Sequence, residues 1–335
     1  MKYKNTRSIW LLLSLLVLMS HSAYAQLISD TPITSPTEFK AYLLEHDSLF
    51  TSGAEQPPDS AMLENTFKHN VRLSGIVYKV DGLRIRGFVF KPKAPGQYPA
   101  VIYNRGGNRD FGSLTFPGSS IGPAQLAEIA SWGYVVVASQ YRGAGGSEGA
   151  DHFGGDDVND VLALPAVLAE FDEVDTLRIG LFGWSRGSMM NFLALKKGLK
   201  VSAVAVGGIL ADLALSLEHR PQFSKMFAEM DPQYQRDPQA WLAERSVLNW
   251  LDRLPKVPML VLNGSSDWRT RSTQALKLVE ALDEKRYPVR FIMYEGADHA
   301  ISQYREEVFM QLRNWLDRYV RDQQPPPIIN YAPKE

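Results

Sequence analysis

A serine between two glycines, in Gly183-Trp184-Ser185-Arg186-Gly187, is the strongest candidate for chemistry in this sequence. The apolar run 177–182 before it is typical of a strand buried on both faces, and apolar residues from 188 onward follow helical spacing. Flanking glycines let a strand turn directly into a helix and let the serine adopt a strained conformation that exposes its hydroxyl. The pattern therefore predicts that Ser185 is a nucleophile at a strand–helix turn.

Two other stretches, 118–122 and 145–149, also contain the pattern Gly-x-Ser-x-Gly. The first follows a polar loop that contains proline, with no strand leading into it. The second lies in a glycine-rich loop with no helix after it. Sequence context therefore selects Ser185, for which the alternative is a small residue that only serves a tight turn.

A serine hydroxyl needs an adjacent histidine to accept its proton, and an acid to hold that histidine in place. Only His219 and His299 follow Ser185 in the chain. His299 comes directly after the last predicted strand, whereas His219 lies in a long insertion. We therefore expect His299 to be the general base, with a surface histidine as the alternative.

The acid is expected in the loop after the strand 258–262, because ends of parallel strands meet at one edge of a sheet. Asp267 is the carboxylate in that loop. Two alternatives remain open. Asp298 adjoins the histidine in sequence and is poorly placed to face its ring, and Asp252 precedes the strand at its opposite end.

Backbone N–H groups are expected to stabilise the oxyanion that forms during acyl transfer. One donor is the residue after the nucleophile, Arg186, and the other belongs to the segment Arg105-Gly106-Gly107. The side chains of Arg105 and Arg186 would flank the oxyanion position, which favours a substrate with a nearby carboxylate. For Arg105, a solvent-facing loop arginine is an equally good interpretation.

Composition excludes several other classes of function. The chain has no cysteine, and 36 Lys+Arg nearly balance 37 Asp+Glu. Nucleic-acid or membrane-surface binding is therefore not expected, and neither is a cysteine zinc site. The acids and histidine of 149–157 suggest a metal site, but they do not match the calcium-loop pattern, and acids in the first turn of a helix have an ordinary electrostatic explanation. We expect no metal and no cofactor.

The first 25 residues read as a secretory signal peptide. Lys2, Lys4 and Arg7 precede the apolar run 9–19, and Ala23-Tyr24-Ala25 follows it. The apolar run is too short for a typical transmembrane helix, although a retained anchor is the alternative. We therefore expect cleavage after Ala25 and a periplasmic or secreted protein.

Apolar runs alternate with helical patterns from residue 71 to 322, which predicts a mostly parallel, doubly wound α/β sheet of eight strands. The turn at Ser185 is similar to the nucleophile elbow of the α/β-hydrolases, so we expect the α/β-hydrolase fold. Asp81-Gly82 predicts a hairpin at the sheet edge. Residues 26–70 are expected to form a helical extension and linker, and the proline-rich tail 323–335 to be disordered. The insertion 209–254 is predicted to be a helical lid, with helices packed away from the site as the alternative. Its large apolar residues would line a substrate pocket: Met226, Phe227, Met230, Trp241 and Trp250.

These motifs resemble the catalytic domain of the prolyl oligopeptidase family of serine peptidases over residues 71–322. Gly183-Trp184-Ser185 matches the family's elbow, and Tyr141-Arg142-Gly143 with the later 154–158 resembles its segment before the second helix. The resemblance implies a triad of Ser185, Asp267 and His299, with oxyanion support at Gly107 and Arg186.

The family's β-propeller does not fit within residues 26–70. The expected activity is hydrolysis of short peptides or small esters through an acyl-enzyme, with a carboxylesterase as the alternative and a non-catalytic binding protein as a third class. The oligomeric state is left open.

Overall fold

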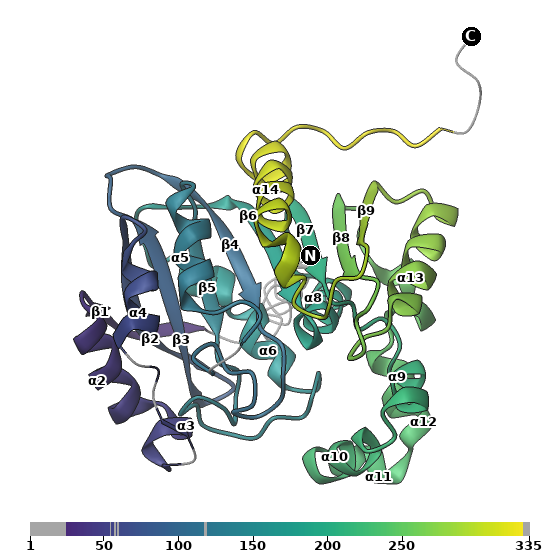
Figure 1. The fold of residues 1–335 in the computed structure, drawn as a ribbon, viewed down its shortest axis with the longest axis horizontal. Coiled ribbons are helices and arrows are strands. Elements are labelled where there is room, and N and C mark those ends of the chain that lie inside the picture. Colours follow the sequence, from purple (N-terminus) through teal and green to yellow (C-terminus); the bar gives the residue numbers. More distant parts are fainter. Residues whose placement is uncertain (1–24, 54, 57, 59, 117–118, 331–335) are drawn as a thin grey trace, which may run out of the picture.

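Nine strands form one sheet in the order β1-β2-β3-β5-β4-β6-β7-β8-β9 (Figure 1). The computed structural model describes residues 25–330 except 54, 57, 59 and 117–118, so the predicted signal peptide, apart from Ala25, lies outside the described residues. The strands are β1 (Gln26–Ile33), β2 (Val71–Val80), β3 (Leu83–Pro92), β4 (Tyr98–Asn104), β5 (Val135–Ser139), β6 (Val174–Trp184), β7 (Ala203–Gly207), β8 (Met259–Gly264) and β9 (Val289–Tyr294).

The strands from β4 to β9 run parallel, whereas β1, β2 and β3 form an antiparallel unit joined to β5. The Asp81-Gly82 hairpin is confirmed, because Val80 pairs with Leu83 and both turn residues have positive φ, 52° and 83°. The predicted α/β class is also confirmed. However, the sheet has nine strands rather than eight, and β1 rather than the hairpin occupies the edge. Most β1 side chains are exposed or half-buried, so the strand carries no apolar run.

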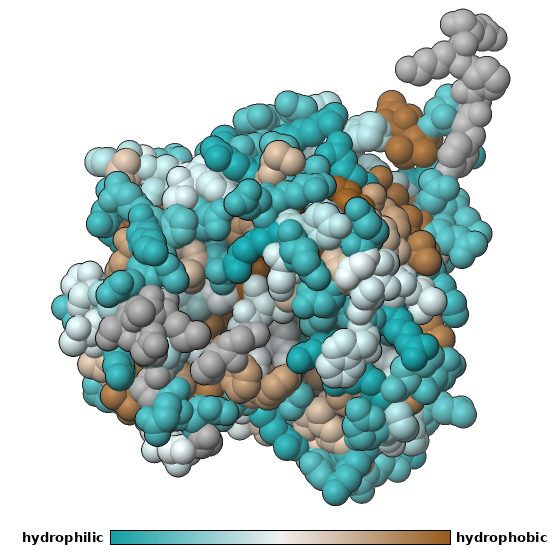
Figure 2. Space-filling view, viewed as in Figure 1, coloured by the Kyte–Doolittle hydropathy of each residue, from teal (hydrophilic) through white to brown (hydrophobic). Residues whose placement is uncertain are grey.

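Helices cover both faces of the sheet. One hydrophobic layer contains residues of α2 (Pro36–His46), α4 (Ser60–Phe67), α5 (Pro123–Ser131) and α14 (Arg305–Leu316). The other contains residues of α6 (Asp157–Leu162), α7 (Leu164–Leu168), α8 (Arg186–Lys196) and α13 (Ser272–Glu284). The face of the molecule drawn in Figure 2 is largely hydrophilic, with hydrophobic residues in separate patches.

The N-terminal extension contains the predicted helix, α2, and more. Ser35 caps this helix by accepting a hydrogen bond from the Glu38 N–H at 3.2 Å, and the Glu38 carboxylate accepts one from the Thr34 N–H at 2.8 Å. Two elements that the sequence did not predict follow it, α3 (Ser48–Thr51) and α4. The extension is therefore a strand and three helices rather than one helix and a linker.

The insertion is helical as predicted, with α9 (Leu213–His219), α10 (Phe223–Met230), α11 (Pro232–Arg236), α12 (Pro238–Arg245) and the short 3₁₀ helices Val247–Asn249 and Leu251–Arg253. Its aromatic side chains pack against one another: the ring centroids of Phe227 and Trp241 are 4.8 Å apart, and the Trp241 indole donates to Asp231 at 2.7 Å. The prediction that these side chains line the substrate pocket is therefore wrong, because burying them together gives the insertion a core of its own.

The last helical elements are a short 3₁₀ helix (Ser302–Tyr304), α14 and a π-helical turn, Asp317–Arg321. Residues 323–330 have no helix or strand, Ile328 is 93% exposed, and the last five residues of the predicted tail lie outside the described part. Within residues 25–330, the described segments include no helix long and apolar enough to cross a membrane.

Candidate active site

Ser185 sits at a sharp turn between β6 and α8. Its backbone has φ 59° and ψ −124°, a region that side-chain-bearing residues rarely adopt. The turn is held by hydrogen bonds on both sides: the Ser185 N–H donates to the Gly207 carbonyl at 2.8 Å, and the Ser188 hydroxyl donates to the Ser185 carbonyl at 2.6 Å. The predicted strand–turn–helix geometry is thus present.

The flanking glycines are required because the backbone passes too close for any side chain. A Cβ at Gly183 would lie 2.3 Å from the Gly187 carbonyl oxygen, and one at Gly187 would lie 1.9 Å from the Asn104 carbonyl oxygen. Both distances are far inside van der Waals contact. The two glycines therefore bring the β6–α8 turn against the end of β4, which leads into the loop with the predicted oxyanion donors.

His299 and Asp267 come together from the loops after β9 and β8. The imidazole Nδ1 lies 2.7 Å from Asp267 Oδ2. Thr270, which the sequence did not single out, donates its hydroxyl to the same oxygen at 2.8 Å and its N–H to the other at 2.9 Å. Burial favours a higher pKa for Asp267, but the bonds from His299 and Thr270 outweigh it and hold the pKa below its usual value. The acid is therefore ionised at neutral pH and fixes the ring.

Trp184 links the turn to the histidine loop. Its indole N–H donates to the His299 carbonyl at 2.9 Å, and the ring is buried. A Cβ at Gly207 would lie 2.2 Å from this ring, and one at Gly208 would lie 2.8 Å from His299 Cε1. The lack of a side chain at Gly207, the last residue of β7, and at Gly208 thus lets the indole and the imidazole pack beside Ser185.

A cavity of about 230 Å³ opens over Ser185. Ser185, Trp184 and His299 form part of its wall, and Gly106 and Gly107 form another part. A Cβ at Gly106 would lie 3.1 Å from the Cβ of Ser185, so this loop lies directly against Ser185. The serine, the histidine and the predicted oxyanion segment therefore share one cavity.

Arg186 does not face this cavity, so the prediction that its side chain meets a substrate carboxylate is wrong. The guanidinium is buried and bonds both oxygens of Asp151 at 2.7 Å, and also Asp157 at 2.6 Å. It also donates to the Gly107 carbonyl at 3.1 Å. The acids that suggested a metal site in the sequence thus neutralise Arg186. Its backbone N–H, at the first position of α8, has no partner within the helix and remains available to a ligand.

Arg105 is also turned inward, which overturns both sequence interpretations of its side chain. The residue is 1% exposed and donates to the Gln140 carbonyl at 2.6 and 3.0 Å, and to the Gly106 carbonyl at 3.0 Å. A further bond at 2.9 Å reaches the Arg109 carbonyl. Arg105 and Arg186 together therefore hold the carbonyl groups of the loop that carries Gly106 and Gly107.

The alternatives for base and acid lie elsewhere. Asp298 accepts from the backbone N–H of Ala300 at 3.1 Å, and Asp252 pairs with Lys285 at 2.6 Å on the surface. His219 is exposed on α9. Among the described carboxylates, Asp267 is therefore the one that the structure places on the His299 ring.

Arg269 and Ser119 are among the residues that line the cavity but that the sequence analysis missed or set aside. Arg269 is exposed and lines the cavity, and only the loop conformation after β8 places it there. Ser119, from another Gly-x-Ser-x-Gly stretch, also lines the cavity and donates to the Ser113 carbonyl at 3.0 Å. Ser147, from the third stretch, accepts from the Arg86 N–H at 2.9 Å in a surface turn.

Comparison with known proteins places this chain in a family. Residues 122–323 match the model of the prolyl oligopeptidase family. The Bacillus subtilis protein called "Uncharacterized peptidase YtmA" is 29% identical over 252 residues, which are 74% of this chain and 94% of that protein. Mouse dipeptidyl peptidase 8 is 26% identical over 291 residues, 81% of this chain but 29% of that protein.

Solved structures agree on the fold. An acylaminoacyl peptidase from Pyrococcus horikoshii superimposes with a TM-score of 0.62 at 19% identity, over 77% of this chain and 43% of that one. A Pyrococcus furiosus esterase gives 0.58 at 17% identity, over 76% of this chain and 92% of that one. The fold and the family together define an α/β-hydrolase enzyme. The chain belongs to the prolyl oligopeptidase family.

Proposed function

We propose that this protein is a serine peptidase that cleaves short peptides through Ser185, His299 and Asp267. The observation that carries the proposal is the 2.7 Å contact between His299 Nδ1 and the buried Asp267 carboxylate, at the wall of the cavity that also contains Ser185. Family membership supports peptide bonds as the target. Hydrolysis of small esters by the same groups is the alternative that the experiments below separate.

The proposed reaction follows from the hydrogen-bond roles of these groups. An ionised carboxylate only accepts, so His299 carries its proton on Nδ1 and leaves Nε2 free to take the proton from the Ser185 hydroxyl. The serine oxygen then bonds to the substrate carbonyl carbon. His299 returns its proton to the leaving amine as the C–N bond breaks. Water attacks the acyl-enzyme in the second half of the cycle, again with His299 as the base.

The oxyanion is proposed to bind two backbone N–H groups, those of Gly107 and Arg186. The buried guanidinium of Arg186 supports this arrangement because it bonds the Gly107 carbonyl at 3.1 Å and so ties the two donors together. Removal of one such donor typically lowers kcat by about 10² to 10³. Arg269 is the cation that lines the cavity, and it replaces Arg105 and Arg186 as the proposed partner of a substrate carboxylate.

Active-site labelling with a fluorophosphonate tests the nucleophile. Wild-type protein should label, and Ser185→Ala should not. Ser147→Ala is the matched control, because it removes a serine from the same sequence pattern in a surface turn outside the cavity, and it should label like the wild type. Labelling that persists in Ser185→Ala, or that disappears in Ser147→Ala, would overturn the assignment.

A parallel substrate screen tests the bond that is cleaved. Aminoacyl and prolyl p-nitroanilides are compared with p-nitrophenyl esters of increasing chain length. Amide turnover with kcat/KM comparable to that of the best ester supports the peptidase. Ester turnover without any amide turnover removes the peptidase and leaves a carboxylesterase with the same triad.

Export is a separate proposal that rests on the sequence of the first 25 residues. We propose cleavage after Ala25 and release into the periplasm or the medium. The intact mass of the protein expressed from its full sequence in a Gram-negative host checks this. A protein in the membrane fraction whose mass corresponds to the full chain from Met1 would contradict this proposal.

A further inference from the structure

The loop after β4, which carries the proposed oxyanion segment, folds back on itself beside Ser185. The Asn108 N–H donates to the Phe111 carbonyl at 2.9 Å, and a Cβ at Gly107 would lie 1.9 Å from the same carbonyl oxygen. Gly112 comes equally close, because a Cβ there would lie 2.9 Å from the Gly107 Cα. Phe111 and Gly112, the supporting segment, therefore pack directly on Gly107.

Two residues of the N-terminal extension bond to this loop on either side of the supporting segment. Ser48 donates its hydroxyl to Asp110 at 2.8 Å, one residue before that segment. Asp47 accepts a hydrogen bond from the Thr115 hydroxyl at 2.6 Å, three residues after it. The extension thus fixes both ends of the segment that packs on the proposed oxyanion donor.

Asp47 is buried at the junction of α2 and α3. The residue is 3% exposed, and its other oxygen accepts the Leu49 N–H at 3.0 Å, which caps α3. The side-chain amide of Gln140 donates to Asp47 at 3.5 Å, and its side-chain oxygen accepts the Leu114 N–H at 3.0 Å. Because the backbone carbonyl of Gln140 also accepts from Arg105, one buried group of side chains links the extension to the beginning and the end of the loop.

The contact between Ser48 and Asp110 is held by a third segment, the glycine-rich loop 145–149. The Gly145 N–H donates to the same Asp110 oxygen at 2.7 Å, and the Gly146 N–H donates to the Ser48 hydroxyl oxygen at 2.9 Å. A Cβ at Gly146 would lie 1.9 Å from the His46 carbonyl oxygen, so this loop passes directly against the end of α2. The extension, the loop after β4 and the glycine-rich loop therefore meet at one point.

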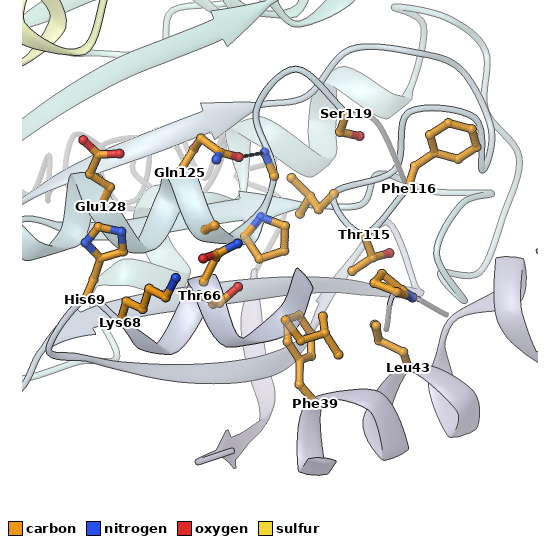
Figure 3. A pocket seen from close by; sticks show the side chains of 17 residues that line it. Phe39, Leu43, Thr66, Lys68, His69, Thr115, Phe116, Ser119, Gln125 and Glu128 are labelled. Carbon is orange, nitrogen blue, oxygen red and sulfur yellow. Dashed lines mark hydrogen bonds between the residues drawn. The ribbon is translucent and has the colours of Figure 1, made fainter. Parts of the chain in front are cut away.

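Apolar packing between the extension and the loop is interrupted by a cavity. This cavity, of about 410 Å³, lies between α2, α4 and α5, and Leu43 of α2 and Thr115 of the loop both line it (Figure 3). Side chains that face an empty space lose the dispersion contacts that a packed neighbour would supply. Asp47 and Ser48 therefore provide a larger share of the attachment than they would in a closely packed interface.

We propose that Asp47 and Ser48 are positioning residues for the oxyanion site, so that the N-terminal extension contributes to the active site. This inference rests on the proposed function, in which the Gly107 N–H binds the oxyanion. The N–H has to point at the position that the oxyanion occupies, so a shift of the loop weakens binding of the transition state more than binding of the substrate. Loss of either contact should therefore lower kcat rather than raise KM.

Asp47→Leu tests the proposal, with kcat expressed per active site that a fluorophosphonate titrates. The substitution removes the acceptor of the Thr115 bond, and kcat per titrated site should fall about tenfold, with KM changed by less than about twofold. Asp47→Asn keeps an acceptor oxygen and should recover most of the kcat. Glu38→Leu is the matched control, because it removes the capping carboxylate at the start of α2, and it should keep the wild-type kcat.

Thr115→Val removes the other partner of the same bond and replaces Asp47→Leu if that variant does not fold. It should lower kcat per titrated site to a similar extent. The two substitutions together should lower it no further than either alone, because they break one contact. Ser48→Ala leaves this contact in place and should lower kcat per titrated site about threefold.

Titration of active sites separates a positioning role from a purely stabilising one. If Asp47 only stabilises the fold, Asp47→Leu has fewer sites to titrate, but each of them keeps the wild-type kcat. That outcome overturns the inference and leaves the proposed function intact, and so does an equal fall of kcat in Glu38→Leu. A wild type that neither labels with fluorophosphonate nor turns over any ester or amide overturns the proposed function, and this inference with it.

Discussion

Replacing Arg186 by methionine tests whether the buried charge cluster beside Ser185 holds the candidate site together. The arginine makes three short contacts to two carboxylates, at 2.6 to 2.7 Å, and all three side chains are at most 1% exposed. Methionine has a similar length and no charge. The change therefore leaves Asp151 and Asp157 buried without their common counter-ion.

The expected loss of stability depends on the hydrogen bonds that the two carboxylates keep. Removing one partner of a buried ion pair costs about 3–5 kcal/mol, because the other charge stays buried. Here each carboxylate keeps two backbone N–H donors, those of Arg109 and Phe153 for Asp151, and of Gly154 and Gly155 for Asp157. These amides reduce the penalty per carboxylate, but two carboxylates now repel each other. We expect the free energy of unfolding to fall by about 3–5 kcal/mol.

Urea unfolding followed by tryptophan fluorescence measures this loss. Arg178→Met is the matched control, since Arg178 pairs with Asp175 at 2.8 Å near the surface, and it should cost at most about 1 kcal/mol. Adding Asp151→Asn to Arg186→Met should recover part of the loss by removing one of the repelling charges. A loss below about 1 kcal/mol in Arg186→Met would refute the reasoning. Any folded Arg186→Met should also lose turnover, since the Gly107 carbonyl loses its donor.

Three further predictions concern the same region. Thr270→Val removes the hydroxyl that donates to Asp267 and should lower kcat/KM about tenfold, with Thr270→Ser restoring most of it; equal activity in both would contradict the positioning role. Gly187→Ala drives a Cβ to within 1.9 Å of the Asn104 carbonyl, so thermal unfolding should show a loss of at least about 2 kcal/mol, and wild-type stability would argue against the close approach. Burial favours a higher pKa for Asp151, but Arg186 and backbone N–H bonds hold the pKa below the ordinary 3.8. The ionised Asp151 therefore stabilises the folded state above pH 3.8, and this stabilisation is lost as the pH falls further. Wild-type stability should therefore fall more steeply than that of Asp151→Asn between about pH 5 and pH 2, and parallel pH profiles would contradict this.

Apolar runs and helical spacing predict most of the fold, because buried parallel strands are runs of aliphatic residues. They also predict where the candidate site lies, since the ends of parallel strands converge at one edge and so bring the loops of Asp267 and His299 together. The strand β1 could not be found in this way, because an edge strand with exposed side chains has no such run. The sequence pattern therefore predicts that these residues belong to a helical extension.

The sequence does not predict the direction in which a long side chain points. Arg186 follows Ser185, and Arg105 belongs to the predicted oxyanion segment. Sequence alone cannot tell whether the two side chains face a substrate or turn inward. The outcome depends on partners far along the chain, Asp151 for the first and the Gln140 carbonyl for the second. The aromatic residues of the insertion pose the same problem, since apolar side chains suit a pocket wall and a packed core equally well.

The positions of the proposed catalytic groups along the chain have a consequence for biosynthesis. Gly107, Ser185, Asp267 and His299 follow four different strands, and β9, which carries the histidine loop, is the last strand to be made. Contacts between such distant segments form late in folding, because the chain between them must be ordered first. A nascent or partly folded chain thus has a serine but no base. The proposed peptidase would become active only when its own sheet is complete, and this would protect its unfolded segments from self-digestion.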